Sequence, residues 1–271
     1  MRPRNLIDSM RNRALSLGQY VNVQSPEIVE VIGHCGYNHV ILDQMFTALD
    51  WHTTANLVRA AQLFGVSAVV RVQSYPFGLE GTESTSLSAV ARALGIGADG
   101  AMVSIGSVTE LEHCLRVQRD AHHGRIWISP DVAELDAGRL EARPAEASSF
   151  FVMPLIEMTR LVDEIDQVMS LEGLRCVGVG IHDICSSVGH PFDVEHPDVW
   201  AVIDKLVSAG RSRDVDVWVN TGYRFTTVAD IAARIDRLWD RGVCTIQVQG
   251  PETLLMHTLN GIRCATRAGV A

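Results

Sequence analysis

Residues 39–71 read HVILDQMFTALDWHTTANLVRAAQLFGVSAVVR, and this stretch contains one complete strand–helix–strand unit. The runs HVILD (39–43) and SAVVR (67–71) are short, apolar and rich in β-branched residues, which is typical of buried strands. Between them, TTANLVRAAQLFG (53–65) has apolar residues three and four positions apart, as in an amphipathic helix. This unit predicts parallel strands covered by helices.

The same alternation of strand and helix patterns runs through most of the chain. Nine segments have the strand pattern: QYVNV (19–23), HVILD (39–43), SAVVR (67–71), GAMVS (100–104), RIWIS (125–129), FFVMPLIE (150–157), CVGVG (176–180), DVWVN (216–220) and CTIQV (244–248). Further helical patterns lie between them, as in PEIVEVIGHCG (26–36), VTELEHCLRVQRDA (108–121) and TVADIAARIDRLWDRG (227–242). Ser25 and Asp50 precede helical segments and are predicted to be N-caps.

About eight strand–helix units over about 250 residues predict a (β/α)8 TIM barrel of the α/β class. A doubly wound sheet is the competing fold, but no GxGxxG motif follows the first strand. Since a barrel needs eight strands, one candidate is surplus, and we interpret RIWIS (125–129), which a long polar segment follows, as part of a loop excursion. No linker divides the chain, so residues 1–271 are expected to form a single domain.

Composition excludes several classes of protein. A net charge of −9 and a pI near 5.5 argue against nucleic-acid binding, which needs a basic surface. No apolar run approaches the roughly 20 residues that cross a membrane. The basic N-terminal stretch lacks an apolar core and is interpreted as an amphipathic helix rather than a secretion signal. Six scattered cysteines without a CxxC pair indicate reduced thiols and a cytoplasmic protein.

Charged side chains stand where four of the predicted strands end. HVILD ends on Asp43, SAVVR on Arg71 and FFVMPLIE on Glu157, and CVGVG leads through His182 to Asp183. In a TIM barrel the active site lies at the carboxyl ends of the strands, so these groups are expected to meet there. Glu157 and Asp183 offer only oxygen ligands, which suit Mg²⁺ or Mn²⁺ together with a chelating substrate.

The segments GYNHVILD, VVRV, PLIEMTR and VGVGIHDICSSVGHP resemble the HpcH/HpaI aldolase family, the metal-dependent (class II) pyruvate aldolases that cleave 4-hydroxy-2-oxo acids. The resemblance covers the chain from residue 18 to about residue 255. It implies that Glu157 and Asp183 bind the metal. It also implies that Arg71 binds the keto oxygen and the enolate, and that Asp43 matches an aspartate that orients a catalytic histidine.

The chain departs from the family pattern at several positions. The family has Asp-Gly-Glu-His after its second strand, with the histidine as general base, whereas this chain reads Asp43-Gln44-Met45-Phe46. Phe46 cannot transfer a proton, and Asp43 without its histidine is expected to cap the following turn or to bond Gln44. Three further differences concern a first-strand tryptophan, a glutamine before the metal-binding glutamate and a Gly-Pro-x-Asp motif, which become Tyr20, Leu155 and a segment containing His182.

These features predict a metal-dependent carbon–carbon lyase that acts on a 2-oxo acid through an enolate, with an altered substrate or reaction. His182 is a candidate to replace the missing base. Loss of CO₂ from a β-keto acid needs no such base, so a decarboxylase or an enolate-condensing biosynthetic enzyme is an alternative. Met45 and Phe46 make the pocket mouth more apolar, which favours a substrate with a hydrophobic or aromatic part.

Two readings from other classes remain open. One is a non-catalytic homologue that binds a metal or ligand, and the other is a citrate-lyase-like enzyme that uses CoA thioesters. The resemblance also implies a homo-oligomer built from dimers, as in the hexamers of the family. In that arrangement a last helix at about residues 251–268 is exchanged between subunits.

Overall fold

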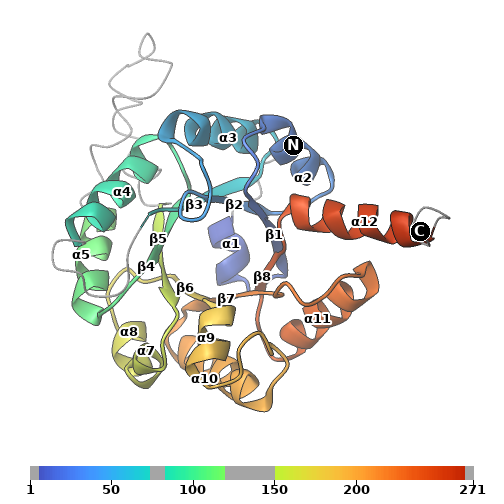
Figure 1. Ribbon diagram of the computed structural model, residues 1–271. Coiled ribbons are helices and arrows are strands. Elements are labelled where there is room, and N and C mark those ends of the chain that lie inside the picture. The colour runs from blue at the N-terminus through green and yellow to red at the C-terminus, as the bar shows by residue number, and fades with distance from the viewer. Residues whose placement is uncertain (1–5, 74–82, 120–149, 266–271) are drawn as a thin grey trace, which may run out of the picture.

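The computed structural model describes residues 6–73, 83–119 and 150–265. Eight parallel strands pair in chain order around a closed barrel, and the last pairs with the first. Their bounds are β1 Ser16–Val21, β2 His39–Asp43, β3 Ser67–Arg71, β4 Gly100–Ser104, β5 Phe151–Ile156, β6 Cys176–Val179, β7 Asp216–Asn220 and β8 Thr245–Val248. Figure 1 looks into this barrel and shows the helices as a ring around it. The predicted TIM barrel is confirmed.

The helices follow the strands as the alternating pattern predicts. Their bounds are α1 Leu6–Arg11, α2 Pro26–His34, α3 Trp51–Leu63, α4 Glu83–Gly95, α5 Val108–Arg119, α7 Thr159–Asp163, α8 Ile165–Met169, α9 Ile181–Ser187, α10 Pro197–Arg213, α11 Val228–Asp240 and α12 Pro251–Ala265. Asp50 caps α3 as predicted, because its carboxylate accepts a hydrogen bond from the Thr53 amide. Ser25 stands at the N-cap of α2, but its side chain caps no amide and its hydroxyl donates to Glu27 instead.

Most strand predictions are close to the observed bounds, and those for β2, β3, β4 and β7 coincide with them. The first strand was placed wrongly at 19–23, since β1 begins at Ser16 and ends at Val21. Gly18 explains the error: it suggests a turn, but it lies within the strand against His39, where an added Cβ would be 2.0 Å from the His39 Nε2. The segment 125–129 lies outside the described residues, so its interpretation as a loop stays a prediction.

Two apolar layers hold the barrel together. Alternate strand residues face outward, so that Val40 and Leu42 pack in the large cluster between sheet and helices. Ile41 faces the barrel interior with Phe151 and Trp218 in a second cluster. Since side chains alternate along a strand, the strands β1 to β7 contribute to both layers, whereas β8 adds the buried polar residues Thr245 and Gln247 in place of apolar ones.

The two terminal helices occupy very different positions. α1 appears inside the outline of the strand ring when the barrel is viewed end-on (Figure 1), and it buries Leu6, Ile7 and Met10 in the interior cluster. α12 instead points away from the barrel (Figure 1). Within the part of the chain that the structure describes, no helix is both long and apolar enough to cross a membrane.

Candidate active site

A pocket of about 350 Å³ lies at the carboxyl ends of the strands. It is the end of the barrel at which TIM-barrel enzymes carry their active sites. All of the predicted site residues line it: Tyr20, Asp43, Phe46, Arg71, Glu157, His182 and Asp183. The structure therefore places the predicted site residues around one pocket, while their roles stay predictions.

Arg71 is the central charge of the pocket. Its strand register places it directly beside Asp43, because these residues are paired at the ends of β2 and β3. The Arg71 guanidinium lies 3.6 Å from an Asp43 carboxylate oxygen and 3.8 Å from one of Glu157. Both distances are too long for hydrogen bonds, and the buried Arg71 Nε has no partner among the described residues. The guanidinium is held by charge, while its N–H donors remain available to a ligand.

Asp43 shapes the turn that follows β2. Its carboxylate accepts hydrogen bonds from the amides of Met45, at 2.8 Å, and Phe46, at 3.3 Å. The Thr47 hydroxyl donates to the Asp43 carbonyl oxygen and tightens the same turn. The expectation that Asp43 caps this turn is confirmed.

Phe46 stands where the family has its histidine. Its ring is 73% exposed and lies over Arg71, with 4.6 Å from the guanidinium carbon to the ring centroid. An aromatic ring in this position attracts a cation but offers no proton acceptor. Phe46 therefore lies beside the Arg71 guanidinium but cannot transfer a proton.

Glu157 and Asp183 come together at the ends of β5 and β6. Burial raises the pKa of Glu157 above its ordinary value and the Asp183 carboxylate raises it further, while Arg71 and a hydrogen bond from Ser104 lower it. A Cβ at Gly180 would lie 2.5 Å from the Glu157 Cγ and within 3.4 Å of oxygens of both carboxylates. Glycine thus leaves a space that both carboxylates face.

The donor set of this space fits a divalent cation. Two oxygen ligands and room for water or a chelating substrate are what Mg²⁺ and Mn²⁺ use in such sites. A cation there would also relieve the repulsion between Glu157 and Asp183. The residues present therefore fit the metal that the family resemblance implies.

His182 borders the pocket beside Asp183. Its ring stacks on Tyr223, with 5.2 Å between centroids and 17° between planes, and it also contacts Phe192 at 6.0 Å. Both ring nitrogens are buried and lack a partner among the residues described. Burial lowers the pKa of His182, an effect that Asp183 opposes. The imidazole is fixed by its aromatic neighbours and has two unused hydrogen-bonding atoms.

Sequence reasoning missed several polar residues of the pocket. Asn22, Asn220, Tyr223 and Glu252 all line it. The Asn22 amide nitrogen donates to one Glu252 oxygen at 2.5 Å, and the other Glu252 oxygen is buried without a partner in the described chain. Asn220 ends the correctly predicted strand β7, so its signal in the sequence is an amide side chain at a strand end. Glu252 belongs to the last helix, which suggested subunit contacts rather than a pocket residue.

The Tyr20 phenol donates a weak hydrogen bond to a thioether sulfur. Its hydroxyl lies 3.7 Å from the Met102 sulfur, and burial raises the pKa of Tyr20. Tyr20 is therefore a neutral wall of the pocket.

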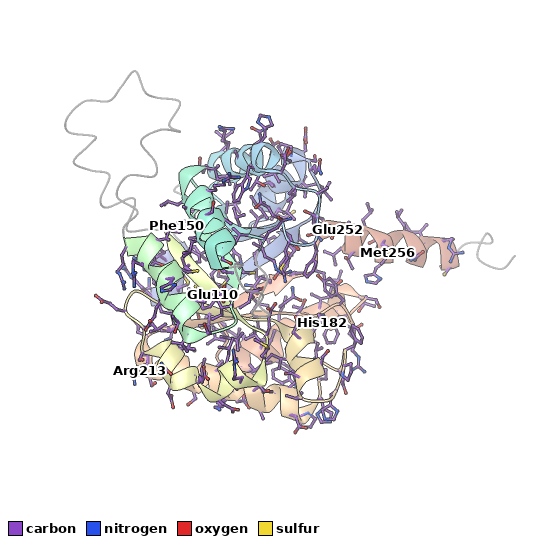
Figure 2. The ribbon with its side chains drawn as sticks, turned by 60° about the vertical axis from the view of Figure 1, so that its left-hand side comes forward. Glu110, Phe150, His182, Arg213, Glu252 and Met256 are labelled. Atoms are coloured by element: carbon purple, nitrogen blue, oxygen red, sulfur yellow. The ribbon has the colours of Figure 1, made fainter. Side chains whose placement is uncertain are left out.

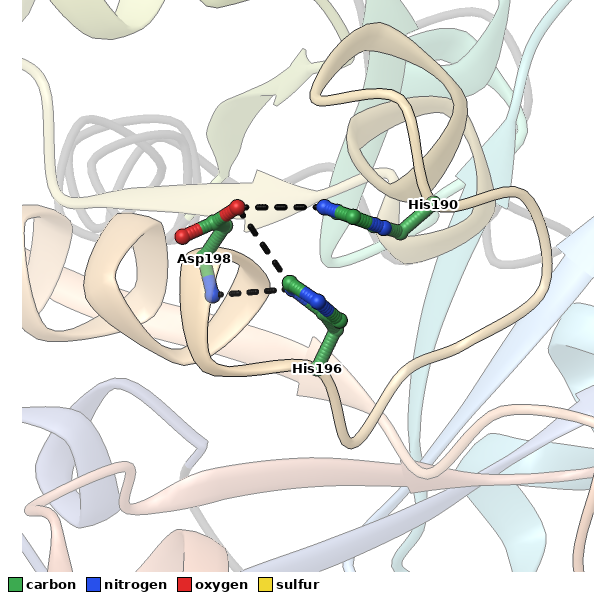
Figure 3. A group of neighbouring side chains, drawn as sticks. All are labelled: His190, His196 and Asp198. Atoms are coloured by element: carbon green, nitrogen blue, oxygen red, sulfur yellow. Dashed lines mark hydrogen bonds and ion pairs between the residues drawn. The ribbon is translucent and has the colours of Figure 1, made fainter.

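A His–His–Asp group outside the pocket also resembles a metal site. His190, His196 and Asp198 cluster at the start of α10 (Figure 3), and both rings approach the same Asp198 oxygen, at 3.1 and 3.5 Å. The two rings are stacked, however, with 3.3 Å between centroids and 18° between planes. Ring nitrogens bind a metal in the ring plane, so two nearly parallel rings do not aim at one point. Since His196 Nδ1 accepts from the Asp198 amide, this group is better explained as the N-cap of α10.

The fold and the pocket define a TIM barrel with an arginine and a carboxylate pair at the strand ends. The family model described as HpcH/HpaI aldolase/citrate lyase matches residues 16–245, and the chain belongs to this family. The family description names aldolases and citrate lyases, both of which are lyases, and this points to a lyase. The description covers both aldolases and citrate lyases and does not separate these two readings.

Individual relatives are distant. The chain is 24% identical over 242 residues to a hydroxypyruvate/pyruvate aldolase from Paraburkholderia phytofirmans, covering 82% of this chain and 87% of the relative. An HpcH/HpaI aldolase structure from Desulfitobacterium hafniense has a TM-score of 0.77 at 24% identity and covers 97% of this chain and 96% of that one. A citrate synthase structure has a TM-score of 0.76 at 20% identity, covering 99% and 100%. These structures share the fold, and at such identities they do not identify a substrate.

Proposed function

We propose that this protein is a divalent-metal-dependent carbon–carbon lyase that acts on a 2-oxo acid through an enolate. The observation that carries the proposal is Arg71, a largely buried guanidinium that lies between the Asp43 and Glu157 carboxylates and whose Nε has no partner among the described residues. Fixed donors aimed at developing charge are usually the largest contribution to catalysis of this kind. Substrate binding by Arg71 and by the neighbouring walls Tyr20 and Phe46 is part of the proposal.

Glu157 and Asp183 would hold the ion, Mg²⁺ or Mn²⁺. When bound, such an ion supplies Lewis-acid stabilisation of negative charge on a chelating 2-oxo acid. The buried position of Glu157 and the exposed position of Asp183 suit an ion that keeps one side open to ligands. Arg71 contributes its own share by donating hydrogen bonds to the enolate oxygen as charge develops there.

The missing base determines which reaction this site supports. Cleavage of a 4-hydroxy-2-oxo acid requires a group that removes the hydroxyl proton, and Phe46 cannot do so. Breaking the bond to CO₂ in a β-keto acid leaves the bonding electron pair on the enolate directly, so that step needs no base. Decarboxylation, or condensation of the resulting enolate with an acceptor, is therefore the reaction that these residues support best.

His182 is the proposed proton carrier for the steps that still need one. Burial keeps its imidazole neutral at neutral pH, and both ring nitrogens are unused in the described structure. Its stacking on Tyr223 fixes the ring at the mouth, where protonation of an enolate or of a product alkoxide would take place.

The mouth of the pocket supports an acceptor or substrate with a hydrophobic or aromatic part. Phe46, Phe192 and Tyr223 are 73%, 74% and 48% exposed, and each lies against Arg71 or His182. Exposed aromatic side chains at a pocket mouth provide stacking surface for a planar group. A small hydroxylated aldehyde would leave these rings uncovered.

The proposal includes a homo-oligomer built from dimers of this chain. α12 carries Leu255, Met256, Leu259 and Ile262 on its surface, and each of these side chains is more than half exposed. An apolar helix face of this kind is stable when a neighbouring chain covers it. Figure 2 shows Met256 on this helix, beyond Glu252 at its root.

The experiment that tests the function is oxaloacetate decarboxylation with Mg²⁺ or Mn²⁺, after subtraction of the rate with the ion alone. EDTA should abolish turnover, and Glu157→Ala should abolish both turnover and Mn²⁺ binding measured by titration calorimetry. Glu164→Ala, an exposed carboxylate outside the pocket, is the matched control and should behave as the wild type. Mn²⁺ binding without turnover of oxaloacetate or of any aromatic β-keto acid would favour the alternative, a non-catalytic binding homologue.

A further inference from the structure

A second pocket lies at the opposite end of the barrel from the candidate active site. Its volume is about 270 Å³, equal to roughly nine water molecules at about 30 Å³ each. It lies between α1, the start of β6 and β7, and the end of α10. Figure 2 shows Arg213, at this pocket, on the opposite side of the barrel from His182 and Glu252.

Guanidinium groups dominate the wall of this second pocket. The charged lining side chains are Arg11, Arg13, Arg175, Arg213, Asp214 and Asp216. This local excess of positive charge occurs in a chain whose net charge is −9. Neither composition nor the barrel architecture requires such a concentration of arginines in one cavity.

The acidic groups nearby neutralise these arginines only in part: Arg11 lies 4.0 Å from Asp8 in an exposed pair on α1. Arg13 is 3.9 Å from Asp214, whose side chain is 82% exposed, so this pair is weak. Burial raises the pKa of Asp216 to about 6, and its carboxylate is already engaged by the Thr245 hydroxyl. At neutral pH this carboxylate is still mostly ionised, and it interacts with Arg13, so it supplies part of the countercharge for that residue but none that is paired with Arg175 or Arg213.

Two of the four arginines have no countercharge of their own. Within residues 6–73, 83–119 and 150–265, neither Arg175 nor Arg213 has an ion-pair partner. The Arg175 Nη1 is buried and bonds no atom of the described chain. Burial lowers the pKa of Arg175, and the charge of Arg11 lowers it further. A buried cationic donor that is repelled by a neighbouring cation is unfavourable unless an anion accepts its hydrogen bonds.

We propose that this arginine pocket binds a small dianion of the phosphate or dicarboxylate class. Arginine forks match the oxygens of phosphate and carboxylate groups and can bind them through paired hydrogen bonds. A dianion between Arg175 and Arg11 replaces their repulsion by two attractive contacts, and Arg213 closes the site from α10.

The bound anion joins elements that lie far apart in the chain. α1 has six residues and is held mainly by Leu6, Ile7 and Met10. An anion shared by Arg11 on this helix and Arg175 before β6 ties α1 to the barrel floor. The ligand acts on the stability of the barrel, since the interior apolar cluster separates this pocket from Arg71.

Titration calorimetry with inorganic phosphate and with succinate, in EDTA at constant ionic strength, tests the site. Removing one charge-assisted partner is expected to weaken binding roughly ten- to hundredfold. Arg175→Gln and the more exposed Arg213→Gln should both show this loss, and the second variant decides the question if the first does not fold. Arg116→Gln, on the exposed face of α5, is the matched control and should bind as the wild type.

An Arg71→Ala variant separates this pocket from the candidate active site. It should retain the phosphate binding that Arg213→Gln loses, and wild-type thermal stability should rise with phosphate more than with chloride. Whether phosphate or succinate binds more tightly identifies the ligand class. The proposal is wrong if neither anion binds, if both pocket variants bind as the wild type, or if Arg71→Ala removes the binding.

Discussion

Replacing Phe46 by histidine is the change that tests the proposed chemistry most directly. Its side chain is 73% exposed, and its main loss is the contact with Arg71, worth about 0.5–1 kcal/mol at an exposed site. The fold should therefore survive the substitution. The residue 46 amide already bonds the Asp43 carboxylate, so an imidazole at this position lies within reach of Asp43 and of the substrate beside Arg71.

The expected gain is confined to reactions that need a base. A positioned general base contributes about 10²–10⁴ in rate. Asp43 is already occupied, because one of its oxygens accepts two backbone amides and the other faces Arg71 at 3.6 Å. Its ability to orient the new imidazole is limited, and we expect a gain near the lower limit, about 10². Oxaloacetate decarboxylation should change by less than about threefold, since that step needs no base.

The assay is release of pyruvate from a 4-hydroxy-2-oxo acid, coupled to lactate dehydrogenase, with Mn²⁺ present. Phe46→Ala is the control, because it opens the mouth without adding a base. If Phe46→Ala gives the same gain as Phe46→His, access rather than proton transfer limits cleavage. If Phe46→His gives no gain while decarboxylation and the circular dichroism spectrum are unchanged, residue 46 does not face the reacting bond and the reasoning is refuted.

Three further predictions concern the metal site, the barrel interior and assembly. Gly180→Ala should lower Mn²⁺ affinity at least about tenfold in calorimetry, because its Cβ would lie 2.5 Å from the Glu157 Cγ; unchanged affinity would contradict the proposed ligands. His39 is fully buried, and burial lowers its pKa from 6.5 to about 3. The His39 imidazole therefore takes up a proton below about pH 6.5 in the unfolded chain but stays neutral in the folded chain. The free energy of unfolding should fall by about 2 kcal/mol between pH 6.5 and 5.0. Urea unfolding at the two pH values should show this loss in the wild type and a smaller one in His39→Gln. Leu259→Arg, on the exposed face of α12, should reduce the mass measured by light scattering from an oligomer to a smaller species, and a monomeric wild type would contradict the assembly.

The sequence predicted the barrel well because its strands are buried on both faces. A strand whose centre is a continuous apolar run, such as residues 68–70, has little ambiguity when strong helical patterns flank it. The first strand was misplaced because Gly18 is required by a contact with His39, and a contact 21 residues away leaves no local signal. Bounds that depend on long-range packing are hard to read from a linear pattern.

The candidate site was predictable to the extent that strand ends carry charge. Arg71 and Asp43 each end a strand, and strand pairing alone places them side by side. Glu252 and Tyr223 could not be found in this way, because they follow strands in loops or helices whose path depends on tertiary packing. The arginine pocket is still less visible, since Arg11, Arg175 and Arg213 are far apart in the chain and each resembles an ordinary surface residue.

The charge of the active-site pocket has a consequence for kinetics. Its charged lining side chains are the carboxylates of Asp43, Glu157, Asp183 and Glu252 and the guanidinium of Arg71. A 2-oxo acid is itself an anion and is repelled by this excess of negative charge until a cation enters. We therefore expect a compulsory order in which the ion binds first and the substrate second. In initial-rate measurements the apparent substrate affinity would then improve with ion concentration, while saturating substrate would make the maximal rate independent of it.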